Sequence, residues 1–263
     1  MLALIAGKGA LPALIAAAQP TPPLVAMLMG NAPDGLTPDV EFRVETIGSL
    51  LEVLKQRGVK DICLCGAIER PNLDPAALDA QTVPLVPTLM QAAGQGDDAA
   101  LRAIMQLFEQ AGFSIKAAHD LVPSLVASEG ILSTRAPDAQ MHDDVAHGMA
   151  VLAALSPFDI GQACVVGQGQ VIGIETIAGT DALIAGLPDV PQRKAAMLIK
   201  APKSDQDLRA DMPTIGPDTI NAVAEMALAG VAIKAGGVLM IAPERCVELA
   251  NEYGLVLWAH GEA

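Results

Sequence analysis

Residues 2–12, Leu-Ala-Leu-Ile-Ala-Gly-Lys-Gly-Ala-Leu-Pro, decide the fold of this chain. The first five residues form an unbroken aliphatic run, which is typical of a strand buried on both faces of a sheet. A Gly-x-Gly turn follows, and a helix pattern begins at Leu11. A strand, a glycine turn and a helix in this order predict an open, mostly parallel sheet with helices on both faces.

The pattern continues to about residue 122 and predicts an N-terminal Rossmann-like domain over 1–122. We expect further strands at 24–29, 40–45 and 61–67 and helices at 50–57, 85–93 and 97–110. The periodicity weakens over 123–138, where we place a linker.

A C-terminal mixed α/β domain is predicted over 139–263, which makes the fold class a two-domain α/β fold. We expect helices at 141–155, 219–229 and 243–252, and strands at 163–166, 171–175, 196–199 and 255–258 and near 231 and 238. The strands at 163–166 and 171–175 are joined by Gly-Gln-Gly, a hairpin signal.

Composition excludes several classes of protein. Sixteen basic and thirty acidic residues give a net charge of −14, which argues against a nucleic-acid-binding protein because such proteins present a basic surface. The chain is 52% hydrophobic, but it has no uncharged apolar run long enough to span a bilayer, and a cytoplasmic location is expected. The four cysteines lack a zinc spacing, so we expect structural thiols in the core.

The glycine turn allows three interpretations. Gly7-x-Gly9 resembles a dinucleotide fingerprint, but Pro12 stands at the third glycine position and no acidic residue ends the second strand at Met29. An NAD(P)-dependent oxidoreductase is therefore a minor alternative. Amides at a helix N-terminus can still bind a phosphate or a nucleoside, and a tight structural turn explains the segment equally well.

The most charged segment is 199–219, Ile-Lys-Ala-Pro-Lys-Ser-Asp-Gln-Asp-Leu-Arg-Ala-Asp-Met-Pro-Thr-Ile-Gly-Pro-Asp-Thr. Its three prolines exclude a continuous helix and a central strand, so we expect a loop that presents a polar site. Lys200 and Lys203 can contact phosphate oxygens, and Asp211 can bind Mg²⁺ or orient a water molecule. The alternative is a solvated linker with internal salt bridges.

Two further segments allow both a structural and a functional interpretation. Asp97 or Asp98, after Gly96, could cap the helix at 97–110 or bind a metal, and the cap is favoured. Thr180 and Asp181 follow a predicted strand and begin a helix, where a cap and a phosphate or metal-phosphate ligand are about equally supported. The pairs His119-Asp120 and His142-Asp143 lack the wider spacing of metal hydrolases and favour a solvated surface.

An ordered set of motifs resembles one family. The motifs are Leu-Ile-Ala-Gly-Lys-Gly-Ala-Leu-Pro (4–12), Gly-Ala-Ile-Glu-Arg-Pro (66–71), Gly-Asp-Asp-Ala-Ala-Leu-Arg (96–102), Asp-Ile-Gly-Gln (159–162), Glu-Thr-Ile-Ala-Gly-Thr-Asp-Ala-Leu (175–183), Lys-Ala-Pro-Lys (200–203) and Asp-Met-Pro-Thr-Ile-Gly (211–216). Together they are similar to the LpxI-type UDP-2,3-diacylglucosamine pyrophosphatases of lipid A biosynthesis. Each motif alone is weak, and the ordered set across both domains is specific.

The resemblance implies a Mg²⁺-dependent hydrolase, with Mn²⁺ as the alternative metal, that encloses UDP-2,3-diacylglucosamine in a cleft between its domains. Water is expected to attack the β-phosphorus and release UMP and 2,3-diacylglucosamine 1-phosphate (lipid X). Asp211 matches the catalytic aspartate and is also assigned to the metal, with Asp181, Asp97 and Asp98 as further candidate ligands. The substrate-binding residues assigned with it are Gly9, Ala10, Leu11, Arg70, Thr180, Asp181, Lys200, Lys203 and Thr214.

The amphiphilic product implies transient contact with the inner face of the inner membrane, without an anchor. A non-catalytic sensor of UDP-sugars or lipid X, using the same pocket, is the other alternative to the enzyme. The sequence does not predict the oligomeric state or the acyl-chain preference.

Overall fold

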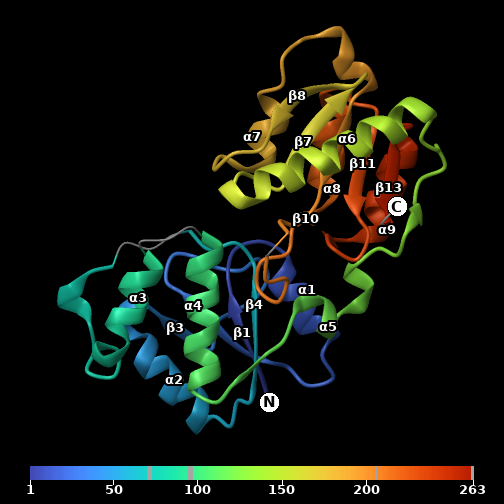
Figure 1. The fold of residues 1–263 in the computed structure, drawn as a ribbon. Coiled ribbons are helices and arrows are strands. Elements are labelled where there is room, and N and C mark those ends of the chain that lie inside the picture. Colours follow the sequence, from blue (N-terminus) through green and yellow to red (C-terminus); the bar gives the residue numbers. More distant parts are fainter. Residues whose placement is uncertain (70–72, 94–96, 205, 262–263) are drawn as a thin grey trace. The chain divides into compact units, whose positions relative to one another are not determined.

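The chain divides into two compact units, each with its own sheet and its own core (Figure 1). The computed structural model describes residues 1–69, 73–93, 97–204 and 206–261. The first unit contains Met1–Pro123 together with Asp207–Asp211, and the second contains Ser124–Gln206 and Met212–Ala263. The sequence-based domain boundaries stay a prediction, as does the substrate cleft between the domains.

The sheet of the first unit is wholly parallel, with strand order β3-β2-β1-β4-β5. Its strands are β1 (Leu2–Ala6), β2 (Leu24–Leu28), β3 (Val40–Phe42), β4 (Asp61–Cys65) and β5 (Ser114–Ile115). β2 is buried along its whole length and β1 and β4 along all but their first residue, as expected for aliphatic runs covered on both faces. The strand order reverses between β1 and β4, which places a topological switch point at the loops that follow these two strands.

Helices cover both faces of this sheet (Figure 1). On one face α1 (Leu11–Ala18) contacts β1 and α5 (Ala118–Leu121), and α5 contacts β4. On the other face lie α2 (Ile47–Gln56), α3 (Val86–Ala93) and α4 (Asp97–Gln110). The core between the sheet and α2 and α4 includes Ile5, Leu54 and Phe108.

The sheet of the second unit is mixed, with strand order β6-β13-β11-β9-β7-β8. Its strands are β6 (Gly130–Ile131), β7 (Ala163–Gly167), β8 (Gln170–Ile174), β9 (Met197–Lys200), β11 (Gly230–Lys234) and β13 (Val256–His260). β9, β11 and β13 run parallel to one another, whereas β7 is antiparallel to both β9 and β8. β8 therefore lies at an edge of the sheet. β6, inside the span where the sequence predicts a linker, pairs with β13.

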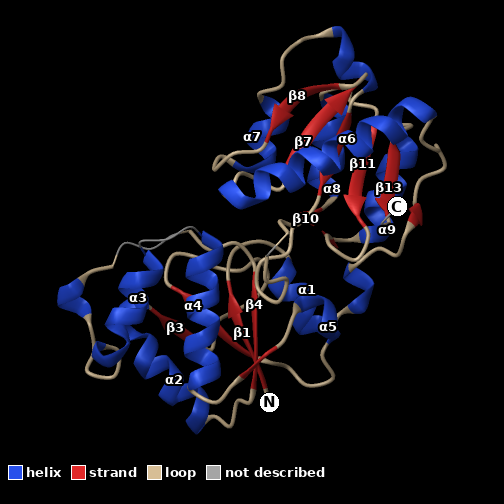
Figure 2. Cartoon of the chain, viewed as in Figure 1, coloured by secondary structure: helices blue, strands red, loops and turns tan. Residues whose placement is uncertain are grey.

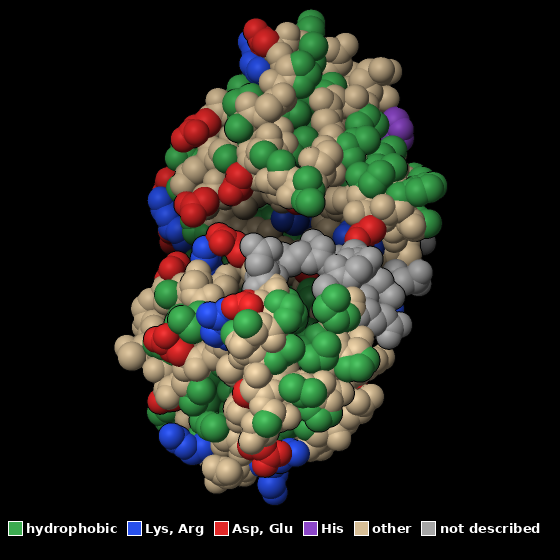
Figure 3. Space-filling model, turned by 90° about the vertical axis from the view of Figure 1, so that its left-hand side faces the viewer, with side chains coloured by type: hydrophobic (Ala, Val, Ile, Leu, Met, Phe, Trp, Pro, Cys, Tyr) green, Lys and Arg blue, Asp and Glu red, His purple; other side chains and the backbone are tan. Residues whose placement is uncertain are grey.

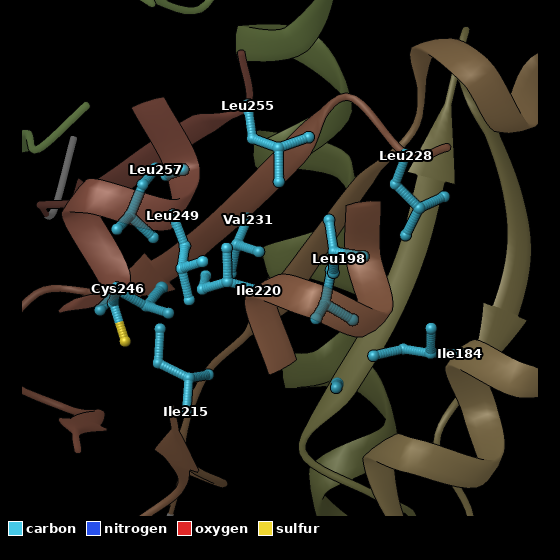
Figure 4. Packing of buried hydrophobic residues seen from close by; sticks show 14 of the residues in the cluster. Ile184, Leu198, Ile215, Ile220, Leu228, Val231, Cys246, Leu249, Leu255 and Leu257 are labelled. Atoms are coloured by element: carbon cyan, nitrogen blue, oxygen red, sulfur yellow. The ribbon is translucent and has the colours of Figure 1, made fainter. Parts of the chain in front are cut away.

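The second unit has three layers. α6 (Ala139–Leu155) covers one face of the sheet through Met141, Val145 and Leu152. On the other face, α7 (Gly179–Ala185), α8 (Pro217–Glu225) and α9 (Pro243–Glu252) form the larger core. Figure 4 shows this core, where side chains of the three helices meet Leu198, Val231 and Leu257 of the strands. Buried Ile184, together with Leu187 just beyond the helix, fixes α7 in this core.

The two-domain α/β fold predicted from the sequence is confirmed, with a parallel first sheet and a mixed second one (Figure 2). Most predicted elements are present, and the clearest local error is the strand at 40–45. This strand ends at Phe42, and Val44–Thr46 forms a 3-10 helix. The Thr46 hydroxyl causes the change, because it accepts a hydrogen bond from the Arg43 amide and donates one to the Arg43 carbonyl.

The described residues of the loop after β9 contain no helix, as predicted, but the loop ends in β10 (Thr214–Ile215). This two-residue strand pairs in parallel with β12 (Leu239–Met240) in a small separate sheet. The pair satisfies backbone groups next to Pro213, which accepts a hydrogen bond from the Leu239 amide (2.8 Å).

Two other expectations from the sequence can be checked. The four cysteines are free and buried, which confirms that they lie in the core. Burial raises the pKa of Cys164 to about 12 and that of Cys246 to about 11, so both thiols stay protonated at neutral pH. Among the described residues, no helix has the length and apolarity needed to cross a bilayer.

Candidate active site

The glycine turn after β1 is held by the loop that follows β4. The Gly7 amide donates to the Cys65 carbonyl and the Lys8 amide donates to the Ala67 carbonyl, both at 2.8 Å. A Cβ atom on Gly7 would lie 2.4 Å from the Ala67 oxygen, so only glycine allows the loops to approach so closely. The first two amides of the turn are thus engaged by protein and do not form a phosphate cradle.

The predicted substrate-binding residues of this turn lie just beyond that contact. Gly9 has φ of 91°, which glycine adopts without strain, and Ala10 and Leu11 begin α1. The Lys8 ammonium is 2.5 Å from the Glu69 carboxylate. The neighbouring Arg70, also predicted to bind substrate, lies outside the described residues.

A buried polar cluster in the second unit brings three predicted site residues together. Lys200, only 7% exposed at the end of β9, donates from Nζ to the Thr180 hydroxyl (2.8 Å) and to the Thr214 carbonyl (3.0 Å). Because an ammonium only donates, the Thr180 oxygen must accept, and its own proton points elsewhere. This cluster fixes a positive charge at the first turn of α7.

The Thr180 hydroxyl donates its hydrogen bond to Glu175, a residue that the sequence analysis did not select. The Thr180 hydroxyl donates to Glu175 Oε1 (2.9 Å), and the Gln162 amide donates to Glu175 Oε2 (2.8 Å). Glu175 is 9% exposed, so its carboxylate is a buried charge with partners on both oxygens. We call Lys200, Thr180 and Glu175 the lysine cluster. An acidic residue directly after an apolar strand and before Gly-Thr-Asp was the signal that could have revealed it.

The contacts of Lys203 are with residues outside the lysine cluster. Its ammonium pairs with the carboxylate of Asp159, a residue in the left-handed backbone conformation (φ 56°). The Lys203 amide also donates to the Gln206 side chain (2.9 Å). The structure therefore gives Lys203 a carboxylate partner within the second unit, and Asp159 belongs to the Asp-Ile-Gly-Gln motif.

Asp211 is carried by a segment that packs with the first unit. Arg209 anchors the segment, because it contacts Asp207 (2.7 Å) and Glu109 of α4 (2.7 Å) and so lies between two carboxylates. Ala210 packs against the core of that unit. Asp211 itself is half-buried, and its amide donates to the Asp207 carbonyl (3.3 Å).

These contacts shift the titration of the anchoring pair. The hydrogen bond from Arg209 lowers the pKa of the Asp207 carboxyl, against an opposing effect of burial. The same bond, with a second one to Glu109, raises the pKa of Arg209 above its ordinary range. The charges of the pair therefore stabilise one another in the folded state.

The predicted metal ligands are distributed over both units. Asp181 is exposed in the first turn of α7, and Asp211 lies in the segment anchored on the first unit. Asp97 begins α4, as predicted, with Asp98 next to it, but the two side chains lie outside the part of the chain whose side chains are described. Among the described residues, no three His, Cys, Asp or Glu side chains gather in a group that could hold a metal.

Mg²⁺ does not require such a group. It binds commonly through one or two carboxylates and completes its shell with water and substrate phosphates. An exposed Asp181 next to Thr180 fits that mode of binding. The metal itself stays a prediction. Acidic and basic side chains are interspersed on the face of the molecule in Figure 3.

The histidine pairs show no metal-binding arrangement among the residues that the structure describes. His142 is exposed and packs edge-on against Trp258, with 4.6 Å between ring centroids. His260 packs on the same indole at 4.8 Å, and burial lowers its pKa. These rings form an aromatic stack at the end of β13.

Comparison with known proteins identifies two matching domains and one full-length relative. A sequence model described as the LpxI N-terminal domain matches residues 1–125, and one described as the LpxI C-terminal domain matches residues 128–258. The chain is also 33% identical, over 266 residues, to a Caulobacter vibrioides protein described as UDP-2,3-diacylglucosamine pyrophosphatase LpxI. That alignment covers 97% of this chain and 95% of the relative.

Proposed function

Since the chain belongs to the LpxI family, we propose that it hydrolyses the pyrophosphate of UDP-2,3-diacylglucosamine to UMP and 2,3-diacylglucosamine 1-phosphate. The observation that carries this proposal is the similarity to the Caulobacter vibrioides pyrophosphatase along 97% of the chain. The products and a transient contact of the amphiphilic product with a membrane surface are part of the proposal.

The lysine cluster supports a site for the diphosphate. Pyrophosphate hydrolysis requires neutralisation of charge on two phosphates, and little covalent chemistry by the protein. Lys200 supplies a positive charge whose position is fixed before substrate binds, because Thr180 and the Thr214 carbonyl hold its ammonium. A charge that needs no reorganisation during the reaction stabilises the transition state most efficiently.

Asp211 is the residue proposed to act on water. Its carboxylate would orient the water molecule and accept its proton as the oxygen attacks the β-phosphorus. The bond between the β-phosphorus and the bridging oxygen then breaks, and UMP leaves with that oxygen. Mg²⁺, or Mn²⁺, held by Asp181 together with the phosphates would neutralise the charge that develops.

The reaction in ¹⁸O-labelled water tests the chemistry. Attack on the β-phosphorus places the label in the diacylglucosamine phosphate, whereas attack on the α-phosphorus places it in UMP, which would overturn the proposed step. The Asp211→Ala variant is the control, and it should lose about 10²- to 10⁴-fold in kcat while it still binds substrate, because general-base catalysis contributes that much. If the purified protein releases no UMP with any divalent metal, the enzyme proposal fails and a binding function replaces it.

A further inference from the structure

A buried asparagine joins the loops that follow β2 and β4 in the first unit. Asn31 is 4% exposed, and its Oδ1 accepts a hydrogen bond from the Glu69 amide (2.8 Å). Its Nδ2 donates to the carbonyls of Met29 (3.3 Å) and Leu28 (3.4 Å). Only this orientation of the side-chain amide gives the Glu69 amide an acceptor and the two carbonyls a donor. Asn31 therefore ties two loops together that are far apart in the sequence.

The two joined loops also hold the glycine turn after β1. β1 lies between β2 and β4 in the sheet, so the bond from Asn31 crosses the carboxyl end of β1. On the β2 side, the Asp34 amide donates to the Gly9 carbonyl (3.3 Å). On the β4 side, the Glu69 carboxylate is 2.5 Å from the Lys8 ammonium. The position of the β4 loop over the turn thus depends on the amide that Asn31 accepts.

This edge of the sheet is where a fold of this type holds its ligand. In open parallel sheets, ligands bind outside the carboxyl ends of the strands at the point where the strand order reverses, which here lies between β1 and β4. Each of the two joined segments also exposes a large apolar side chain, Met29 (54%) and Ile68 (39%). Exposed apolar residues that adjoin one another commonly mark a binding surface.

The loop after β4 has a second attachment that does not involve Asn31. The Asp74 amide donates to Glu45 Oε1 (2.7 Å), and Glu45 is only 2% exposed. The hydrogen bond from Arg43 lowers the pKa of the Glu45 carboxyl to about 2, so this acceptor is charged at neutral pH. Loss of the Asn31 bond therefore loosens residues 66–69, while the later part of the loop stays attached.

We propose that Asn31 is a positioning residue for substrate binding, because it holds residues 66–69 in the place that the substrate requires. The inference rests on the proposed function, and Asn31 acts through the Glu69 amide. Without the bond, the free protein populates the binding-competent position of the segment only in part, and the apparent affinity falls by that fraction. Bound substrate restores the position, so the chemical step keeps its rate.

Two substitutions of Asn31 test the proposal by steady-state kinetics and thermal unfolding. Asn31→Leu keeps the size of the side chain but removes its acceptor and its donors. We expect KM to rise about 3- to 10-fold with kcat within about twofold of the wild type, because a typical hydrogen bond shifts an equilibrium by about that factor. Asn31→Asp keeps an oxygen for the Glu69 amide and loses only the donors. It should lower Tm as well, but its KM should stay within about twofold of the wild type.

Asp39→Ala is the matched control in the same unit. The Asp39 carboxylate accepts a hydrogen bond of the same length (2.8 Å) from the Val25 amide, but at the amino ends of β2 and β3. Its loss should lower Tm and leave KM unchanged. Asn31→Ala also lacks the acceptor and replaces Asn31→Leu if that variant does not fold.

Three results overturn the positioning role of Asn31. They are an unchanged KM in a folded variant without the acceptor, an equal rise of KM in Asn31→Asp or Asp39→Ala, and failure of both Asn31→Leu and Asn31→Ala to fold, which would give Asn31 a structural role. Absence of hydrolysis by the wild type is a different result, and it overturns the proposed function together with this inference.

Discussion

Lys200 and Arg209 belong to the same charged loop, yet they lie in different units and have different surroundings. Lys200 is buried and donates to a hydroxyl and a carbonyl, with Glu175 bound to the far side of that hydroxyl. The Arg209 side chain is 43% exposed and lies between two carboxylates. The contacts of Arg209 join its segment to α4, whereas those of Lys200 fix an ammonium at the first turn of α7.

Among the substitutions that test this comparison, removal of the Lys200 charge should have the largest effect. The Lys200→Met variant keeps most of the side-chain volume but loses the ammonium, so we expect kcat/KM to fall about 10²- to 10³-fold, the usual effect of removing one preorganised group that stabilises a transition-state charge. Steady-state hydrolysis by the purified variant measures this loss.

Arg245→Met is the matched control for Lys200→Met. Arg245 lies on α9 between Glu248 (3.0 Å) and Glu252 (3.1 Å), so it resembles Arg209 in its partners. Its loss should leave hydrolysis unchanged. If Lys200→Met retains activity within about threefold of the wild type, the buried cation has only a structural role. The proposed functional difference between Lys200 and Arg209 is then wrong.

Substitution of Glu175 should have a smaller effect, because this residue positions the Thr180 hydroxyl. Glu175→Gln keeps the shape of the side chain, but its amide can donate to Thr180, which would redirect the hydroxyl proton and weaken the bond from Lys200. We expect kcat to fall about 10-fold with little change in KM, because the defect concerns a charge aligned for the transition state.

The Asp144→Asn variant distinguishes a positioning role of Glu175 in catalysis from a purely structural role. Asp144 is also fully buried in the second unit, where it accepts hydrogen bonds from the Gln168 and Gly169 amides (2.9 and 2.6 Å) of the β7–β8 turn. Its substitution should lower the free energy of unfolding by about 1 to 3 kcal/mol and leave kcat of the folded protein unchanged. If Glu175→Gln behaves in the same way as Asp144→Asn, Glu175 has only a structural role.

The difference between the two regions also explains how far the sequence could predict the structure. Strands such as β1 and β9 were predictable because aliphatic runs dictate burial, and α4 and α9 because their apolar spacing and first residues mark them. The lysine cluster unites Lys200 and Thr180, both selected from the sequence, because each ends or begins an element at the same edge of one sheet.

The remaining features depend on tertiary contacts that have no local pattern. β10 has only two residues, between Pro213 and Gly216, and it exists because β12 pairs with it. The assignment of Asp207–Asp211 to the first unit depends on Glu109 of α4, far away in the sequence. The role of Glu175 depends on the Gln162 amide and the Thr180 hydroxyl, which no periodicity reveals.

The smallest effect is expected for the substitution of Arg209, and it is an effect on stability that should depend on pH. Because the folded pKa of Asp207 is lowered, its contribution to stability is present above the ordinary aspartate pKa and is lost as the pH falls through the folded pKa. Both partners are partly exposed, so the contribution is about 0.5 to 1 kcal/mol. Thermal unfolding between about pH 2 and 7 should show a smaller acid-induced decrease in Tm for Arg209→Met than for the wild type.

A double-mutant cycle assigns that effect to the pair. Asp207→Asn should reduce the acid-induced decrease as Arg209→Met does, and the double variant should be no less stable than the weaker single variant, because each substitution removes the same interaction. Additive losses would mean that the two side chains act independently. In that case Glu109 alone would hold Arg209, and the segment carrying Asp211 would depend on one ion pair to α4.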